Sequence, residues 1–172
     1  MISFALGVLT WTFAEYVIHR GLGHRKGAKN AFSVEHLRHH ATVTYFAPTW
    51  KKAAIGLSVF AITAVLAGVP FAAGFASMYG AYEWLHRRLH THAAIASNPY
   101  GRWARRHHFQ HHFARPKHNH GVTSPLWDLV FGTLDRPSVV LVPRRNALPW
   151  MLDARGELDP RFSSDFALSR AG

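Results

Sequence analysis

The feature that most constrains this chain is a run of 30 residues, Ala53–Tyr82, that contains no charged side chain. As a single helix the run would extend for about 45 Å, well beyond the roughly 30 Å of a bilayer's hydrocarbon core. The sequence Gly68-Val69-Pro70 lies near its middle, and proline disrupts a helix interior. We therefore predict two antiparallel membrane helices, Lys51–Val69 and Phe71–His90. A buried hairpin of a water-soluble protein is the alternative.

A second apolar run, Ile2–Ile18, is interrupted only by Glu15. It has the position of a signal peptide, but no Lys or Arg precedes its apolar part and no small-residue cleavage site precedes His19. We interpret this run as a further membrane helix, which gives three crossings in all.

The basic residues indicate how these helices are oriented. The formal net charge is +11, and seven of the 20 Lys and Arg residues lie between Arg20 and Lys52, with the other 13 after Tyr82. Both segments are therefore predicted on the cytoplasmic side of the membrane, since basic loops stay inside. Attraction to anionic lipid headgroups accounts for the charge. With no recognised nucleic-acid-binding motif, we expect membrane lipids and no nucleic acid as partners.

Histidine is the most over-represented residue type. The chain has 14 histidines and no cysteine, which excludes thiolate ligands, iron–sulfur clusters and disulfide bonds. Histidine is the commonest metal ligand among side chains. Ten of the histidines form four closely spaced groups and are predicted to bind metal: His19 and His24; His36, His39 and His40; His86 and His90; His108, His111 and His112.

The spacing of these groups predicts how they converge. In HLRHH (36–40) and HFQHH (108–112) the histidines at i, i+3 and i+4 fall on one helix face, within reach of a shared centre. His19 and His24 lie about 140° apart on an ideal helix. We therefore expect the helix to end just after His19 and a loop to return His24. All four groups lie at the cytoplasmic ends of spans or in cytoplasmic segments, so they can form one layer at the membrane surface.

Ten histidines exceed the four ligands that one zinc ion takes, so the pattern predicts two metal ions. The other four histidines fall outside the pattern and are interpreted as surface or supporting residues: His92, His107, His118 and His120.

Three other polar residues are predicted to support the ligands. Glu15 precedes His19 by four residues and Glu83 precedes His86 by three, which places each acid on the face of its histidine. A carboxylate there can accept the imidazole's second N–H and fix its tautomer. An acid that only reaches the membrane interface is the alternative. Asn119 is expected either to contact a metal-bound water or to cap a loop.

The order HxxxxH, HxxHH, HxxxH, HxxHH resembles the fatty acid hydroxylase/sterol desaturase superfamily of membrane di-iron enzymes. The resemblance covers about residues 11–134 and is carried by three stretches, and GVTSPLWDLVFGT is similar to the fatty acid 2-hydroxylase branch. It implies an all-α fold, an integral membrane helical bundle under a cytoplasmic helical cap that carries the di-metal site. The matching stretches are WTFAEYVIHRGLGHR (11–25), HLRHHATVTYFAPTW (36–50) and RRHHFQHHFARPKHNHGVTSPLWDLVFGTL (105–134).

The resemblance also implies the chemistry. Two iron ions would use O₂ as co-substrate to insert a hydroxyl into a C–H bond of a fatty acyl chain or acyl-containing lipid. Zinc can replace iron in purified protein but has no redox chemistry. We expect a separate electron donor, either cytochrome b5-like or a ferredoxin with its reductase. Residues 1–136 would form the catalytic domain and 137–172 an irregular cytoplasmic tail.

Two alternatives stay open at this point. The substrate can be a sterol, hopanoid or carotenoid, and desaturation uses the same hydrogen abstraction. A metal transporter or sensor is less favoured, because a transporter needs polar residues midway through its spans and Ala53–Tyr82 contains no histidine.

Overall fold

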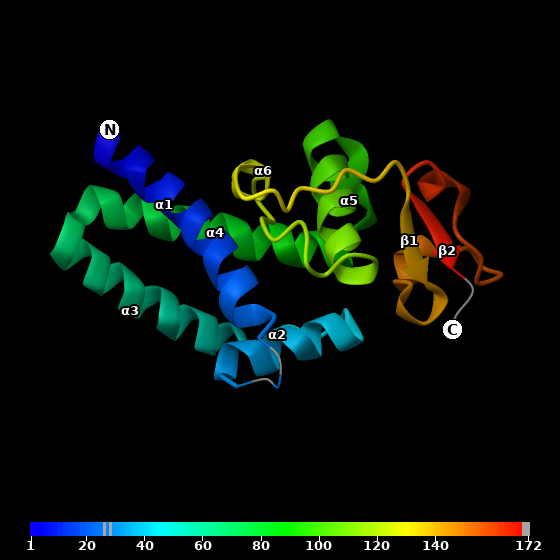
Figure 1. Ribbon diagram of the computed structural model, residues 1–172, viewed down its shortest axis with the longest axis horizontal. Coiled ribbons are helices and arrows are strands. Elements are labelled where there is room, and N and C mark those ends of the chain that lie inside the picture. Colours follow the sequence, from blue (N-terminus) through cyan, green and yellow to red (C-terminus); the bar gives the residue numbers. More distant parts are fainter. Residues whose placement is uncertain (26, 28, 170–172) are drawn as a thin grey trace.

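The computed structural model describes residues 1–25, 27 and 29–169. The chain is mostly helical (Figure 1). Its elements in order are α1 (Ile2–Ile18), the π-helical turn η1 (His19–Gly23), α2 (Ala31–Thr42), α3 (Thr49–Ala67), α4 (Val69–Thr91), the 3₁₀ turn η2 (Ala93–Ser97), α5 (Pro99–Phe113), α6 (Leu126–Val130), β1 (Val140–Pro143), the 3₁₀ turns η3 (Arg144–Asn146), η4 (Pro149–Met151) and η5 (Pro160–Phe162), and β2 (Phe166–Ser169).

The predicted hairpin is present, because α3 and α4 are separated only by Gly68. Gly68 has a φ of +86°, a conformation that side-chain-bearing residues rarely adopt, and Pro70 lies in the first turn of α4, where its missing N–H costs nothing. α1 crosses α4 at close range (Figure 1). A Cβ atom on Gly7 would lie 2.1 Å from the Phe71 carbonyl oxygen, so glycine is needed for this approach.

Among the described residues, two helical segments are long and apolar enough to cross a membrane, Ile2–Gly23 and Thr49–Ala67. α3 has no buried residue within the described part of the chain, although it is rich in large apolar side chains. Lipid therefore accounts for its composition better than packing does. α4, which was predicted as a third span, does not meet the same measure. Its C-terminal half carries Glu83, Arg87 and Arg88 as well as histidines.

The segment after α6 is more ordered than the sequence indicated. Residues 137–172 were expected to be irregular and the fold entirely helical, but β1 and β2 pair in parallel from Val140–Phe166 to Pro143–Ser169. Val140 and Val142 are fully buried against Phe109 of α5. Four-residue strands are too short to show a clear alternating pattern in the sequence. This small sheet covers the side of α5 that faces away from α1, α3 and α4 (Figure 1).

Candidate metal centre

The structure brings the ten predicted ligand histidines together and divides them into two sets of five. Within each set the candidate nitrogen atoms all lie within 4.8 Å of one another. We call these sets the first group and the second group. The first group is His19, His24, His36, His40 and His111, and the second group is His39, His86, His90, His108 and His112.

The division runs through both HxxHH motifs. In α2, His36 and His40 join the first group and His39 joins the second. In α5 the assignment is reversed, so that His111 joins the first group and the flanking pair at 108 and 112 joins the second. Adjacent residues lie about 100° apart around a helix, so the third and fourth positions of the spacing point in different directions. The prediction that each motif serves one shared centre was therefore wrong.

A π-helical turn brings His19 and His24 onto the same side. The sequence predicted that the helix ends after His19, but it continues through η1 with wider i→i+5 hydrogen bonding. Residues five apart then come close to alignment, and the two imidazole centroids lie 5.3 Å apart. Gly23 is required here, since a Cβ atom would lie 2.9 Å from the ring of His36.

Backbone carbonyl groups orient three of these histidines. The Nδ1 atom of His19 lies 2.5 Å from the His120 carbonyl oxygen, and that of His39 lies 2.6 Å from the Tyr45 carbonyl oxygen. His111 contacts a third carbonyl oxygen through Nδ1 at 2.7 Å. A carbonyl can only accept, so each Nδ1 carries the proton. Each Nε2 atom is thereby left with a free lone pair directed into its group.

The arrangement of the Nε2 atoms fits bound metal. The Nε2 atom of His111 lies 2.9 Å from that of His24 and 3.1 Å from that of His40. In the second group the corresponding distances are 3.0 Å for His39–His86 and 2.9 Å for His90–His108. Ligands at right angles, each about 2.1 Å from a metal, are separated by about 3.0 Å. Each group of five could therefore hold a metal ion.

Burial keeps these imidazoles neutral. It lowers the pKa of His24 and of His39 to about 4, from an ordinary value near 6.5. Burial, followed by repulsion from neighbouring histidines, also holds the pKa of His40, His111 and His112 well below the usual range. Neutral imidazole is the form that binds metal, so the site is prepared for ligation at neutral pH.

The two predicted supporting acids bind other partners. Glu15 is buried and accepts hydrogen bonds from the backbone N–H groups of Val122 and Thr123, and from the Thr123 hydroxyl at 2.6 Å. The expected contact with His19 is replaced by the carbonyl of the same loop. Glu83 forms an ion pair with Lys52 at 2.5 Å. These partners come from distant segments, which helix spacing cannot reveal.

Asn119 caps the loop between α5 and α6. It has a φ of +57°, its side-chain amide donates to the carbonyl oxygens of His107 and Asp135, and its side-chain oxygen accepts from the Asp135 N–H at 2.7 Å. Of the two roles expected for Asn119, the described contacts match the capping one.

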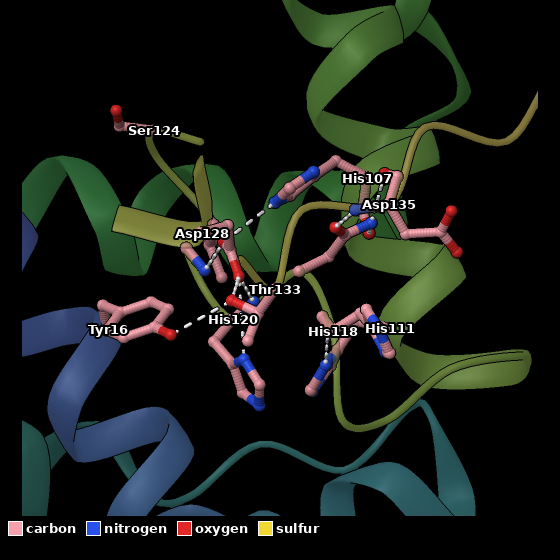
Figure 2. Close-up of polar contacts among 12 residues, drawn as sticks. Tyr16, His107, His111, His118, His120, Ser124, Asp128, Thr133 and Asp135 are labelled. Carbon is pink, nitrogen blue, oxygen red and sulfur yellow. Dashed lines mark hydrogen bonds and ion pairs between the residues drawn. The ribbon is translucent and has the colours of Figure 1, made fainter. Parts of the chain in front are cut away.

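Asp128 is a buried carboxylate that no sequence pattern singled out. It is fully buried, and its carboxylate accepts hydrogen bonds from the N–H groups of His120 and Gly121 and from the Thr133 hydroxyl (Figure 2). His107, interpreted from sequence as a surface or supporting residue, is also buried, with Nε2 3.4 Å from Asp128. Burial by itself would raise the pKa of Asp128, but these donors outweigh it and lower the pKa. A lone Asp in an apolar stretch gave no spacing signal.

An apolar cavity of about 590 Å³ lies between α1, α2, α3 and α4 and reaches the histidines. Histidines of both groups line it: His19 and His36 from the first, and His39 and His86 from the second. The rest of the wall is mainly aliphatic and aromatic, including Trp11, Ile55, Val59, Phe60, Phe75 and Tyr79.

Comparison with known protein families matches residues 4–133 to the fatty acid hydroxylase family. The chain belongs to the fatty acid hydroxylase family. The match covers most of the chain, including all ten histidines, and it confirms the resemblance seen in the sequence.

Named relatives and a solved structure agree with this family. The chain is 33% identical over 148 residues to dihydroceramide fatty acyl 2-hydroxylase FAH2 of Arabidopsis thaliana, covering 76% of this chain and 59% of the relative. It is 33% identical over 146 residues to fatty acid 2-hydroxylase of Mus musculus, covering 76% of this chain and 39% of that relative. A solved structure titled full-length scs7p, with only the hydroxylase domain visible, superposes with a TM-score of 0.63 at 30% identity and covers 79% of this chain and 56% of that one. This member of the fatty acid hydroxylase family thus spans about half the length of the proteins it matches.

Proposed function

We propose that this protein is a membrane-bound, O₂-dependent di-iron enzyme that hydroxylates a C–H bond of a fatty acyl chain or acyl-containing lipid. The observation that carries the proposal is the apolar cavity, because it joins the membrane-facing helices to histidines of both groups. An acyl chain bound in this cavity would contact the aliphatic and aromatic side chains of the wall along its length. One end of the acyl chain would lie at the candidate metal centre.

The proposed ligands are the five histidines of each group, one iron per group. Iron supplies the redox chemistry that activates O₂ for oxidation of an unactivated C–H bond, which zinc does not. The chain contributes the neutral imidazoles and orients three of them. The carbonyl contacts to His19, His39 and His111 fix the tautomer that presents Nε2 to the metal.

The proposed membrane position places α1, α3 and α4 across the bilayer and the histidines at its cytoplasmic surface. The apolar lengths of α1 and α3 support the first two spans, and α4 is the antiparallel partner of α3. Basic residues cluster at the histidine end of these helices, as expected for the cytoplasmic side. Residues 1–136 are proposed as the catalytic unit, with 137–172 as a cytoplasmic segment that packs on α5.

The ends of the cavity differ in polarity, which supports oxidation near the lipid's head. Lys51, Lys52 and Glu83 line it at the histidine end, whereas Phe60 and Phe75 line it further along α3 and α4. The polar head of an acyl lipid favours the charged end and its tail favours the aromatic end. The carbon next to the carboxyl or amide group would then lie nearest the histidines. The relatives' names, which include 2-hydroxylases, support the same position.

Electrons are proposed to come from a separate protein, either cytochrome b5-like or a ferredoxin with its reductase. The basic residues of the proposed cytoplasmic segments suit an acidic carrier.

The deciding experiment measures iron and product together. Protein purified from iron-supplemented cells is analysed for metal per chain, and lipids of the same cells are searched by mass spectrometry for a hydroxylated acyl chain. We expect about two irons per chain and a product that is lost with His39→Ala. His92→Ala, at an exposed histidine outside both groups, is the matched control and should retain both. One metal or none, without a hydroxylated lipid, would overturn the proposal.

A further inference from the structure

The loop between α5 and α6 connects a buried carboxylate to a candidate metal ligand through a single peptide group. The peptide between His120 and Gly121 has its N–H on the Gly121 side and its carbonyl on the His120 side. The N–H donates to the Asp128 carboxylate at 2.8 Å, and the carbonyl oxygen accepts from Nδ1 of His19 at 2.5 Å. The Asp128 carboxylate, the His120–Gly121 peptide and the His19 imidazole are therefore hydrogen-bonded in series, with Nε2 of His19 directed into the first group.

The charge of Asp128 is directed onto this loop. Asp128 has no exposed surface, and within the described part of the chain no Lys or Arg forms an ion pair with it. The imidazole nitrogens nearest its carboxylate are Nε2 of His107 at 3.4 Å and Nδ1 of His120 at 3.6 Å. Its other hydrogen-bond donors are the His120 N–H at 2.9 Å and the Thr133 hydroxyl at 2.7 Å. In a low-dielectric interior, hydrogen bonds in series polarise one another. A negative carboxylate on the N–H therefore makes the carbonyl oxygen of the same peptide a stronger acceptor.

Gly121 shows that the geometry of this peptide is tightly restricted. A Cβ atom at Gly121 would lie 2.2 Å from the Ser124 carbonyl oxygen and 3.2 Å from Oδ2 of Asp128. A residue with a side chain would push the peptide away from the carboxylate. The close approach of carboxylate and backbone therefore depends on glycine at this position.

The neighbouring peptide of the same loop provides an internal comparison. The carbonyl of His118 accepts from His111, but the N–H of that peptide, on Asn119, donates to the carbonyl oxygen of Thr133 at 3.0 Å. A neutral carbonyl thus occupies the place that Asp128 occupies behind His19. The loop therefore contacts two candidate ligands of the first group, His111 and His19. Only the peptide that contacts His19 donates its N–H to a carboxylate.

We propose that Asp128 is a positioning residue for the first group, acting on His19 through the His120–Gly121 peptide. It holds His19 with its proton on Nδ1 and makes Nε2 a stronger metal ligand. A carboxylate that contacts a ligand histidine directly has this effect at many metal sites. Here one peptide group separates the two. The inference rests on the proposed metal centre, because it requires a metal in the first group.

The test uses Zn²⁺ as the probe and measures its affinity by competition with a chelator, independently of turnover. Two backgrounds separate the groups, since His108→Ala disables the second and His36→Ala disables the first. Asp128→Asn removes the charge while keeping the side-chain shape. We expect it to weaken Zn²⁺ binding by about 10–100-fold in the His108→Ala background. In the His36→Ala background the affinity should change by less than about threefold.

Asp165→Asn is the matched control. Asp165 is a buried carboxylate that pairs with Arg102 at 2.8 Å and lies outside both histidine groups. It should leave Zn²⁺ affinity unchanged in both backgrounds. If Asp128→Asn protein cannot be recovered, Asp128→Glu keeps a carboxylate but displaces it, and its effect should again be confined to the first group.

The outcomes separate this inference from the proposed function. Wild-type protein that binds about two Zn²⁺ ions, with a selective loss in Asp128→Asn, supports both. Two bound ions with equal weakening in the two backgrounds, or with none, overturns the role of Asp128 and leaves the metal centre intact. Wild-type protein that binds no Zn²⁺ overturns both.

Discussion

Glu15→Ala tests how firmly the loop after α5 is attached to α1. Glu15 lies in α1, is 4% exposed, and accepts three hydrogen bonds from Val122 and Thr123. These residues are themselves buried, at 1% and 6% exposed. Alanine leaves two backbone N–H groups and one hydroxyl without an acceptor, in a place where water has little access.

The magnitude follows from those three donors. A buried donor left without a partner costs about 1–3 kcal/mol, so three of them give about 3–9 kcal/mol. Single substitutions that cost more than about 4–5 kcal/mol are exceptional, because the structure relaxes. We therefore expect the free energy of unfolding to fall by about 3–5 kcal/mol. Glu15→Gln keeps an acceptor oxygen of similar reach and should lose about 1–2 kcal/mol.

The assay is SDS-induced unfolding in mixed micelles, followed by tryptophan fluorescence for both variants and the wild type. Glu157→Ala is the control, because Glu157 forms an exposed ion pair with Arg144 and such pairs contribute about 0–1 kcal/mol. A loss below about 1 kcal/mol for Glu15→Ala would refute the reasoning. It would mean that water or another acceptor satisfies the freed donors.

Three further predictions concern the cavity, pH and helix packing. Gly56→Leu places a Cβ atom 2.8 Å from the Tyr79 ring and fills the cavity, so kcat/KM for a long acyl substrate should fall about tenfold with iron content unchanged. Gly80→Leu adds a side chain in open space and should not alter kcat/KM. In metal-free protein, burial lowers the pKa of His24 and His39 to about 4, so between pH 6.5 and 4 the unfolded chain binds more protons than the folded one. The free energy of unfolding should therefore fall as the pH is lowered, and an unfolding midpoint that stays constant over this range would contradict the prediction. Gly74→Ala puts a Cβ atom 2.1 Å from a carbonyl oxygen of α1, so thermal unfolding should show a loss of about 1–3 kcal/mol instead of the gain usual for alanine in a helix.

Local features of the sequence were sufficient to locate the helical hairpin and the helix that precedes it. α1 spans the predicted residues Ile2–Ile18 and continues as the π-helical turn η1, and the break between α3 and α4 falls at Gly68, two residues before the predicted break at Pro70. An uncharged run, a proline within it and helical spacing are local properties of the chain. They therefore predict where helices begin and end without any knowledge of the packing. The same holds for the family, because its histidine motifs are short and regularly spaced.

The grouping of the histidines is a tertiary property. Spacing placed His36, His39 and His40 on one helix face, but the directions of the neighbouring helices assign the middle one to a different group. The π-helical turn after α1 is similar, since it packs against α2, where the His36 ring leaves no room for a Cβ atom at Gly23. Helix spacing does not specify which helix lies opposite each face.

By itself, the sequence determined the helical hairpin, the ten candidate ligands and the family. The tertiary structure alone decided which groups orient those ligands. Glu15 was expected to contact a histidine four residues away, but it binds a loop more than 100 residues further along the chain. Asp128 accepts hydrogen bonds from the backbone N–H groups of His120 and Gly121 in the same loop, seven and eight residues before it. The physical reason is that a buried carboxylate takes whichever N–H groups the fold leaves unpaired beside it, and those donors are backbone atoms that every residue type except proline carries.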